Sequence, residues 1–315
     1  MLPPGHGLGG GSMKRILLVA GLALLALVAG VGLYGLRQVS TITVESVAGD
    51  VSMLQGAGGN VGVLRTPAGA VVVDSMTFRM QGEEIREKAE EIGGGPVQVL
   101  LNTHWHADHT HGNPGFAPGT KVVATNRTLG HLRGRDAGSW EGEAAALLPN
   151  ETFDDSHELQ VGGKTVRAVH LGRGHTDGDL VVLFVDDRVL HTGDLFFHRR
   201  YPNIDLESGG SIREWIGTLD RVLALDFDRV IPGHGAATDR EGIRQFQSFL
   251  SQLWAVGEQA ARQGLSLEET LRTANLTADA GYEAIHVPFL LNLDRRFVIQ
   301  RAWEEATGAV RNVGG

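Results

Sequence analysis

The sequence of 315 residues contains no cysteine. A disulfide framework is therefore excluded, and so is any metal site that uses thiolate ligands. A Gly-x-Ser-x-Gly segment is also absent, so nothing indicates a serine nucleophile at a strand-to-helix turn.

Basic residues are fewer than acidic ones: 28 lysines and arginines stand against 37 aspartates and glutamates, and the formal net charge is −9. Lys14 and Arg15 are the only charged residues among residues 1–36, so the rest of the chain is more acidic than the total suggests. Nucleic-acid binding needs a basic surface. We therefore predict a small-molecule substrate and no nucleic-acid partner.

A single long apolar run, residues 16–36, follows the basic pair Lys14 and Arg15. A helix of this length reaches roughly 30 Å, enough to cross the core of a bilayer, and the run is longer than the apolar part of most cleaved signal peptides. We predict that residues 1–40 form an N-terminal extension that carries a membrane anchor, with a cleaved signal segment as the alternative. The basic flank predicts that residues 41–315 lie outside the cytoplasm, at the cell envelope. They would be anchored in the inner membrane, or periplasmic or secreted if the segment is cleaved.

From residue 41 onward, short apolar runs bounded by turn residues alternate with charged segments of helical pattern. We expect strands at 41–44, 61–64, 70–74, Val97–Leu101, 121–124, 165–169, 180–185, 188–190 and Arg229–Ile231. We expect helices at 80–92, after a cap at Asn126, and at 211–225, Arg240–Gln263, 267–274 and 288–306. Asp186 and Asp187 are expected to form a two-residue hairpin turn. Two successive blocks of strands, each followed by a helix and a strand, predict the α/β class and an αββα sandwich of two mixed sheets in a single catalytic domain, residues 41–315.

Residues 104–109 concentrate side chains of the kind that bind metals. His104, His106, Asp108 and His109 follow the expected buried strand Val97–Leu101 directly. A tight loop can turn the first two residues toward one point and the last two toward a second point close by. Imidazole nitrogen and carboxylate oxygen suit an ion such as zinc.

Three later loops add residues of the same kind at strand ends. His175 lies in a glycine-rich loop between two β runs, Asp194 follows the run 188–190, and His234 follows Arg229–Ile231. Each of these signals is weak alone. Together with the His-x-His-x-Asp-His pattern, in this order and spacing from Asp74 onward, they resemble the metallo-β-lactamase superfamily over roughly residues 41–306. Within it, the chain is similar to the group nearest to the subclass B β-lactamases.

The resemblance implies a role for each of these residues. It places His104, His106 and His175 in a first metal site and Asp108, His109 and His234 in a second. Asp194 would bridge the two metals, and Asp74 would steady ligand imidazoles without binding metal. Two Zn²⁺ ions are implied, with iron or manganese as further possibilities.

Such a centre implies hydrolysis by a bridging hydroxide, because two neighbouring cations lower the pKa of a shared water. Asp108 would be the catalytic residue that orients this hydroxide and accepts its proton. We expect a binuclear zinc hydrolase acting on a small ester, lactone, thioester or lactam. The alternatives are a mononuclear iron sulfur-dioxygenase of the same fold and a phosphodiesterase.

Substrate choice is expected to lie in the loops. The segment that follows Asp194 supplies Arg199, Tyr201 and Asp205 as candidate pocket residues, and His111 is a further candidate close to the metals. The best-known secreted β-lactamases have a cysteine where this chain has Asp194 and a lysine where it has Phe197. These departures argue against efficient hydrolysis of lactams.

Overall fold

The structure, a computed structural model, describes residues 41–287 and 291–310. From Ile42 onward the chain forms one compact unit. The predicted anchor, residues 16–36, lies outside the described residues. Among the helices that the structure does describe, none is long and apolar enough to cross a bilayer.

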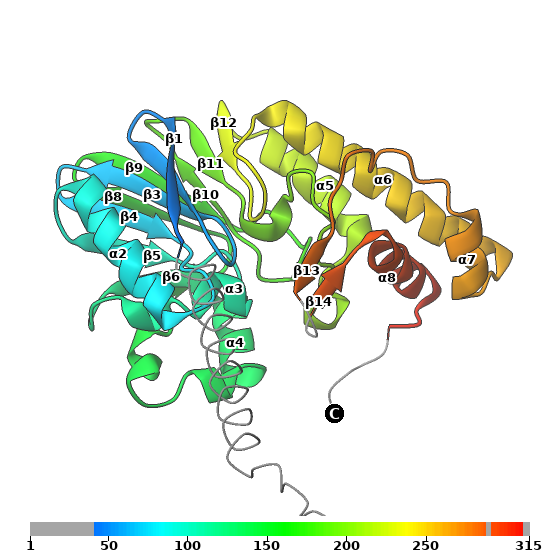
Figure 1. Ribbon diagram of the computed structural model, residues 1–315, viewed down its shortest axis with the longest axis horizontal. Helices are drawn as coiled ribbons and strands as arrows, with labels where there is room; N and C mark the ends of the chain where they lie inside the picture. Colours follow the sequence, from blue (N-terminus) through cyan, green and yellow to red (C-terminus); the bar gives the residue numbers. More distant parts are fainter. Residues whose placement is uncertain (1–40, 288–290, 311–315) are drawn as a thin grey trace, which may run out of the picture. The chain divides into compact units, whose positions relative to one another are not determined.

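The first sheet has seven strands in the order β1 to β7 (Figure 1). It begins as an antiparallel meander, and β4 to β7 then run parallel to one another. Its strands are β1 (Thr43–Ala48), β2 (Val51–Gln55), β3 (Val61–Thr66), β4 (Gly69–Val73), β5 (Val97–Leu101), β6 (Lys121–Thr125) and β7 (Glu151–Phe153).

The second sheet has five strands in the order β12-β11-β10-β9-β8. All its neighbours are antiparallel except β11 and β12, which run parallel. Its strands are β8 (Ser156–Val161), β9 (Lys164–Val169), β10 (Val181–Phe184), β11 (Val189–His191) and β12 (Arg229–Ile231).

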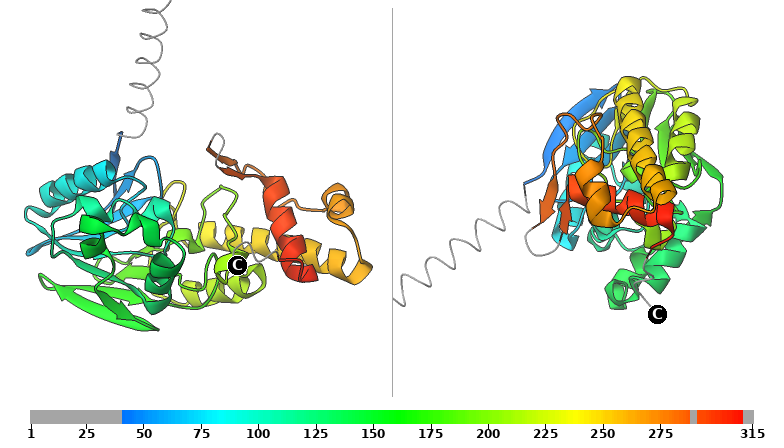
Figure 2. Two further views of the ribbon diagram at one scale, coloured as in Figure 1. Left: turned by 90° about the horizontal axis from the view of Figure 1, so that it is seen from below. Right: turned by 90° about the vertical axis from the view of Figure 1, so that its right-hand side faces the viewer.

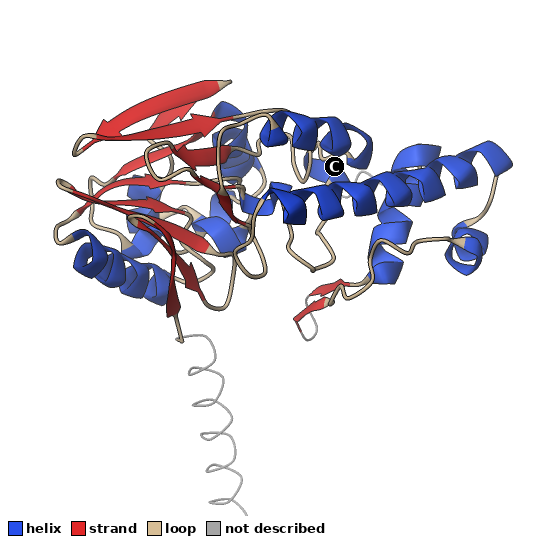
Figure 3. Cartoon of the chain, turned by 90° about the horizontal axis from the view of Figure 1, so that it is seen from above, coloured by secondary structure: helices blue, strands red, loops and turns tan. Residues whose placement is uncertain are grey.

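The two sheets pack face to face, and helices cover their outer faces (Figure 3). Because side chains alternate along a strand, Val71 of β4 packs between the sheets while its neighbour Val72 packs with Ile85 of the outer helix α2 (Arg79–Gly93). In the same way, Val189 faces the first sheet and Leu190 faces the outer helices. The predicted αββα sandwich of the α/β class is confirmed.

The remaining helices range from the four residues of α3 to the 24 residues of α6. They are α3 (Ala107–Thr110), α4 (Asn126–Gly134), α5 (Ile212–Leu223), α6 (Arg240–Gln263), α7 (Leu267–Thr273) and α8 (Arg295–Thr307). Helix α6 extends beyond the sheets, and α8 packs on it through Val298 and Ile299 (Figure 2). A small hairpin, β13 (Ile285–Val287) and β14 (Leu291–Leu293), precedes α8.

Three local predictions need correction: the start of the last helix, the cap of α4 and the length of the turn between β10 and β11. The last helix does not begin at residue 288 but after Asp294, whose side chain accepts a hydrogen bond from the Phe297 N–H at 2.9 Å and so caps α8. Thr125, not Asn126, caps α4, because its hydroxyl accepts from the Thr128 N–H.

The turn between β10 and β11 is longer than the predicted two residues, since Phe184 pairs with Val189. The Asp187 carboxylate accepts the Asp50 N–H at 2.8 Å and binds the Lys164 ammonium at 2.9 Å. The turn therefore has four residues, 185–188, and Arg188 takes a positive φ of 53° in it.

The buried Trp215 of α5 ties the outer helices to the loop that follows β11, because its indole N–H donates to the Leu195 carbonyl at 2.9 Å. We expect Trp215→Phe to lower the free energy of unfolding by about 1–3 kcal/mol, since that carbonyl then loses its partner and the smaller ring leaves space. Urea denaturation measures the change. Trp254→Phe, at a half-buried position on α6, is the matched control and should cost less; an equal loss would contradict this role of the hydrogen bond.

Candidate metal centre

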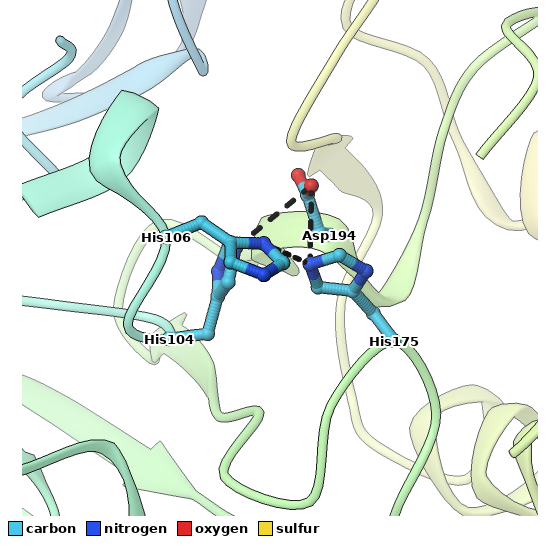
Figure 4. Close-up of side chains that lie close together, drawn as sticks. All are labelled: His104, His106, His175 and Asp194. Atoms are coloured by element: carbon cyan, nitrogen blue, oxygen red, sulfur yellow. Dashed lines mark hydrogen bonds and ion pairs between the residues drawn. The ribbon is translucent and has the colours of Figure 1, made fainter. Parts of the chain in front are cut away.

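The structure brings all seven predicted ligands together in two adjacent groups. The first group contains His104, His106, His175 and Asp194, and Figure 4 shows their side chains converging. The second group contains Asp108, His109 and His234. Within each group, the candidate ligand atoms lie within 4.8 Å of one another.

The groups form where strands of both sheets end. His104 and His106 follow β5, and the single turn of α3 that comes next carries Asp108 and His109. Asp194 lies in the short 3-10 helix Gly193–Leu195 after β11, and the next strand, β12, leads to His234. Because β11 and β12 are parallel, their carboxyl ends meet at one edge of the sheet, where ligands commonly bind in α/β proteins.

The Asp194 carboxylate stands between the two groups. Its Oδ2 lies 3.6 Å from His175 Nε2 and 3.9 Å from His104 Nε2. Its Oδ1 lies 3.1 Å from His109 Nε2 and 3.4 Å from His234 Nε2. Each oxygen therefore faces a different group, which is the geometry that a bridging carboxylate requires.

Several atoms of the centre are buried without a hydrogen bond in the described part of the chain: His104 Nε2, His109 Nε2 and Asp194 Oδ1. A buried polar atom without a partner is costly, so such atoms call for an explanation. Burial lowers the pKa of His104, and it lowers the pKa of His175 to about 4, so both rings are neutral with a free lone pair. This nitrogen and oxygen donor set fits divalent cations such as zinc, and also iron or manganese.

The second group attracts positive charge. Burial alone would lower the pKa of His234, yet Asp194 and Asp108 raise it to about 9. The same two carboxylates raise the pKa of His109 well above its usual value, again against burial. A divalent cation between these residues would supply the charge that the two carboxylates otherwise draw from protons, and metal binding would accordingly release protons.

The orientation of four of the five imidazoles is fixed from behind. Asp205 Oδ2 lies 2.9 Å from His106 Nε2, so His106 turns its Nδ1 toward His175 Nε2 at 2.7 Å. His175 Nδ1 donates to the Asn203 carbonyl at 2.9 Å and leaves Nε2 for the centre. Partners of this kind set the tautomer and the aim of metal-binding imidazoles.

Asp74 occupies the position behind the other two histidines. Its carboxylate accepts the Thr103 N–H and hydroxyl at 2.8 Å each and lies 2.7 Å from His109 Nδ1. The Thr103 hydroxyl in turn lies 3.0 Å from His104 Nδ1. Asp74 also has a positive φ of 66°, a conformation that is costly for a non-glycine residue and is often found at functional sites. The predicted steadying role of Asp74 is consistent with these contacts.

Two glycines leave room for the ligands. An ideal Cβ on Gly59 would lie 2.2 Å from the ring of His109, and one on Gly233 would lie 2.0 Å from Asp194 Oδ1. Any side chain at either position would push a ligand out of place. Both positions therefore need glycine for steric reasons.

The four predicted pocket residues are placed differently from the ligands. His111 turns to Asp136, with its Nε2 at 2.7 Å from that carboxylate. Tyr201 is buried in the core, and its hydroxyl donates to Asp279 at 2.8 Å. Asp205 supports His106 from behind, as described above, and so acts on a ligand rather than lining a pocket. Arg199 lines a hollow that includes no member of either group.

A hollow of about 280 Å³ does open beside His234. It is lined by Arg200, Ile285 and Asn60 among others, with Gly58 and Gly235 supplying backbone. Arg200, which the sequence did not distinguish from its neighbour Arg199, thus comes close to the centre. The supporting roles of Asp205 and of the Asn203 carbonyl were also missed. The carboxylate type of Asp205, on the loop after Asp194, was the only signal for the former.

Comparison with known proteins identifies the family. The model of the metallo-beta-lactamase superfamily matches residues 54–234, so the chain belongs to this superfamily. A linear primary-alkylsulfatase from Pseudomonas sp. is 22% identical over 215 residues, which cover 55% of this chain and 40% of that protein. The chain thus spans less than half the length of that relative.

Two further comparisons are closer in length. The alpha subunit of a 2,4-dinitroanisole O-demethylase from Nocardioides sp. is 24% identical over 238 residues, which cover 72% of this chain and 68% of that one. A solved metallo-beta-lactamase from Pontibacter korlensis superposes with a TM-score of 0.58 at 22% identity, covering 67% of this chain and 99% of that chain. This likeness supports the fold.

We expect Asp205→Ala to weaken metal binding roughly 10–100-fold, because His106 then loses the partner that aims its Nδ1 at the centre. Titration with zinc against a chelating dye measures the affinity without any assay of activity. Asp154→Ala removes an exposed carboxylate that binds Asn126 and is the matched control, which should leave zinc affinity unchanged. Equal affinities for Asp205→Ala and the unaltered chain would contradict the role given to Asp205.

Proposed function

We propose that this protein is a binuclear zinc-dependent hydrolase that acts on a small ester-, lactone-, thioester- or lactam-like substrate. The observation that carries the proposal is the position of Asp194, with one oxygen toward each group of ligand-type residues. The completeness of the second group favours two metals over one. A centre with two metals in turn favours a hydrolase over the mononuclear iron sulfur-dioxygenase.

The residues of the centre divide the chemistry between them. Bound divalent cations would polarise the bond to be broken and make a water molecule more acidic. The Asp108 side chain is 36% exposed, which makes it the most accessible of the seven candidate ligands. Its Oδ2 lies 3.3 Å from His234 Nε2, so it can reach both the centre and a water that enters from the hollow. We therefore assign to Asp108 the roles of holding that water and taking its proton.

Arg200 is placed to meet the substrate. It lines the hollow beside His234, and its guanidinium group forms an ion pair with Glu283 at the rim, where both side chains are exposed. An exposed ion pair of this kind is weak, so an anionic group on a substrate can compete for the arginine.

The decisive experiment combines metal analysis with a substrate panel. We expect about two zinc ions per chain, loss of activity on removal by a chelator, and recovery on adding zinc. The panel contains a lactam, a lactone, a thioester and a phosphodiester, with an alkyl sulfate and an aryl methyl ether added because of the named relatives. One iron per chain together with oxygen uptake on a persulfide would instead identify a dioxygenase.

We expect Asp108→Ala to reduce the metal content from about two ions to about one, because the first group stays intact. The rate of hydrolysis should fall by roughly 10²–10⁴-fold, the usual contribution of a positioned proton acceptor. Asp136→Ala, which removes the partner of His111 outside both groups, should retain both ions. An Asp108→Ala chain that keeps two ions and full activity would contradict the role of Asp108.

We further propose that the catalytic domain acts at the cell envelope, because the apolar run at residues 16–36 is long enough to serve as an anchor. Fractionation of cells that make the full chain should find it in the membrane fraction. Protease added outside the inner membrane should degrade the catalytic domain, and deletion of residues 1–40 should move it to the cytoplasm. A full chain found in the cytoplasm would contradict this proposal.

A further inference from the structure

The β13–β14 hairpin has one apolar face. Ile285 pairs with Leu293 and Val287 pairs with Leu291, and directly paired residues point to the same face of a hairpin. His286 and Asn292 pair between them and point to the opposite face, with His286 Nδ1 3.4 Å from Asn292 Oδ1. The hairpin is therefore apolar on one side and polar on the other.

The apolar face leads from the candidate metal centre out to solvent. At its inner end, Ile285 is half-buried and lines the hollow beside His234. At its outer end, Val287 is 41% exposed and Leu291 is 39% exposed. These two residues are among the few large apolar side chains that the described part of the chain leaves open to solvent.

The hairpin is held at the centre by the loop that follows Asp194. Residues Arg200 and Glu283 form an isolated parallel bridge, in which the Glu283 N–H donates to the Arg199 carbonyl at 3.0 Å and the Tyr201 N–H donates to the Glu283 carbonyl at 3.2 Å. Arg199 takes a positive φ of 55° at this point. The next two residues, Ala284 and Ile285, line the hollow together with Arg200.

We propose that the substrate carries a hydrocarbon chain that lies along Ile285, Val287 and Leu291 while its reacting bond sits at the candidate metal centre. The inference rests on the proposed hydrolase function and names the substrate class for it. What favours a substrate chain as the occupant is continuity: Ile285, at the inner end of the apolar face, lines the same hollow as His234, and Val287 and Leu291 continue that face outward. Apolar side chains exposed beside a binding site commonly mark a surface that a ligand covers.

A hydrocarbon chain on this strip makes affinity depend on chain length. Each methylene removed from water contributes up to about a fourfold gain in binding. The strip starts at the hollow, so short acyl groups would end before they reach Val287 and Leu291. Discrimination between long and short chains therefore reports directly on these two residues.

The test compares substrates and ligands of different chain length on the full chain loaded with zinc. We expect kcat/KM for p-nitrophenyl esters to rise from butyrate to decanoate. In the double variant Val287→Asn and Leu291→Asn, the ratio of the decanoate to the butyrate value should fall about tenfold. The matched control, His286→Ala with Asn292→Ala, changes the opposite face of the same hairpin and should keep the ratio of the unaltered chain.

Binding of straight-chain carboxylates, followed by calorimetry from butyrate to decanoate, gives a readout that needs no turnover. If neither these esters nor any member of the substrate panel is hydrolysed, the proposed function fails, yet a chain-length dependence of binding that the double variant loses still supports the assignment of the hydrocarbon chain to this face. Affinity and kcat/KM that do not depend on chain length would overturn the proposal, as would an equal loss of the ratio in the control variant.

The hairpin would serve another occupant if the double variant kept its chain-length preference. Reduced binding to phosphatidylglycerol vesicles would then indicate a membrane, and a change from dimer to monomer would indicate a second copy.

Discussion

The buried carboxylate of Asp194 is the interaction on which the arrangement of the centre depends. It is 4% exposed and surrounded by four imidazoles, which it meets with two oxygens on two sides. An ionised acid in such a place is costly unless positive charge compensates it. The histidines hold its pKa well below the usual range although burial would raise it. Positive charge beside Asp194 therefore stabilises its ionised form, and the two groups of ligand-type residues around it are candidate positions for metal ions.

The two sheets contribute unequally to this centre. The first sheet supplies Asp74 after β4 and the loop from His104 to His109 after β5, and the second sheet supplies Asp194 and His234 after β11 and β12. The centre therefore lies where the sheets meet, and it can form only when both are packed. A link also runs to the C-terminal helices. Arg301 of α8 donates to the Ile204 carbonyl at 2.9 Å, and the neighbouring residues of that loop support His106 and His175.

The candidate ligands could be predicted from the sequence because they cluster at the ends of apolar runs. Such runs form strands, and the ends of neighbouring strands lie close together in a sheet. The strands that were missed lack this simple pattern. β8 (Ser156–Val161) alternates but has few apolar residues. The strands β13 and β14 have only three residues each, too few for a period of two to be read with certainty, and β14 fell inside the helix expected at residues 288–306. The partners behind the ligands could not be predicted, since Asp205 and His106 are 99 positions apart and nothing local indicates that they meet. Likewise Arg199 and Arg200 are alike in sequence, and only the folded structure shows that Arg200 is the one that lines the hollow beside His234.

The centre and the hollow beside it have different origins in the chain. The match to the superfamily spans residues 54–234 and contains every ligand-type residue of the two groups. Ala284 and Ile285, which close one side of the hollow, lie outside that match, on a segment held to the loop at Arg200 by a single bridge. The candidate metal-binding residues thus lie within the part of the chain that the family model matches, whereas one side of the hollow is built from a segment outside it. Substrate preference should therefore be sought in the hairpin and in the loop that holds it, rather than in the residues around Asp194.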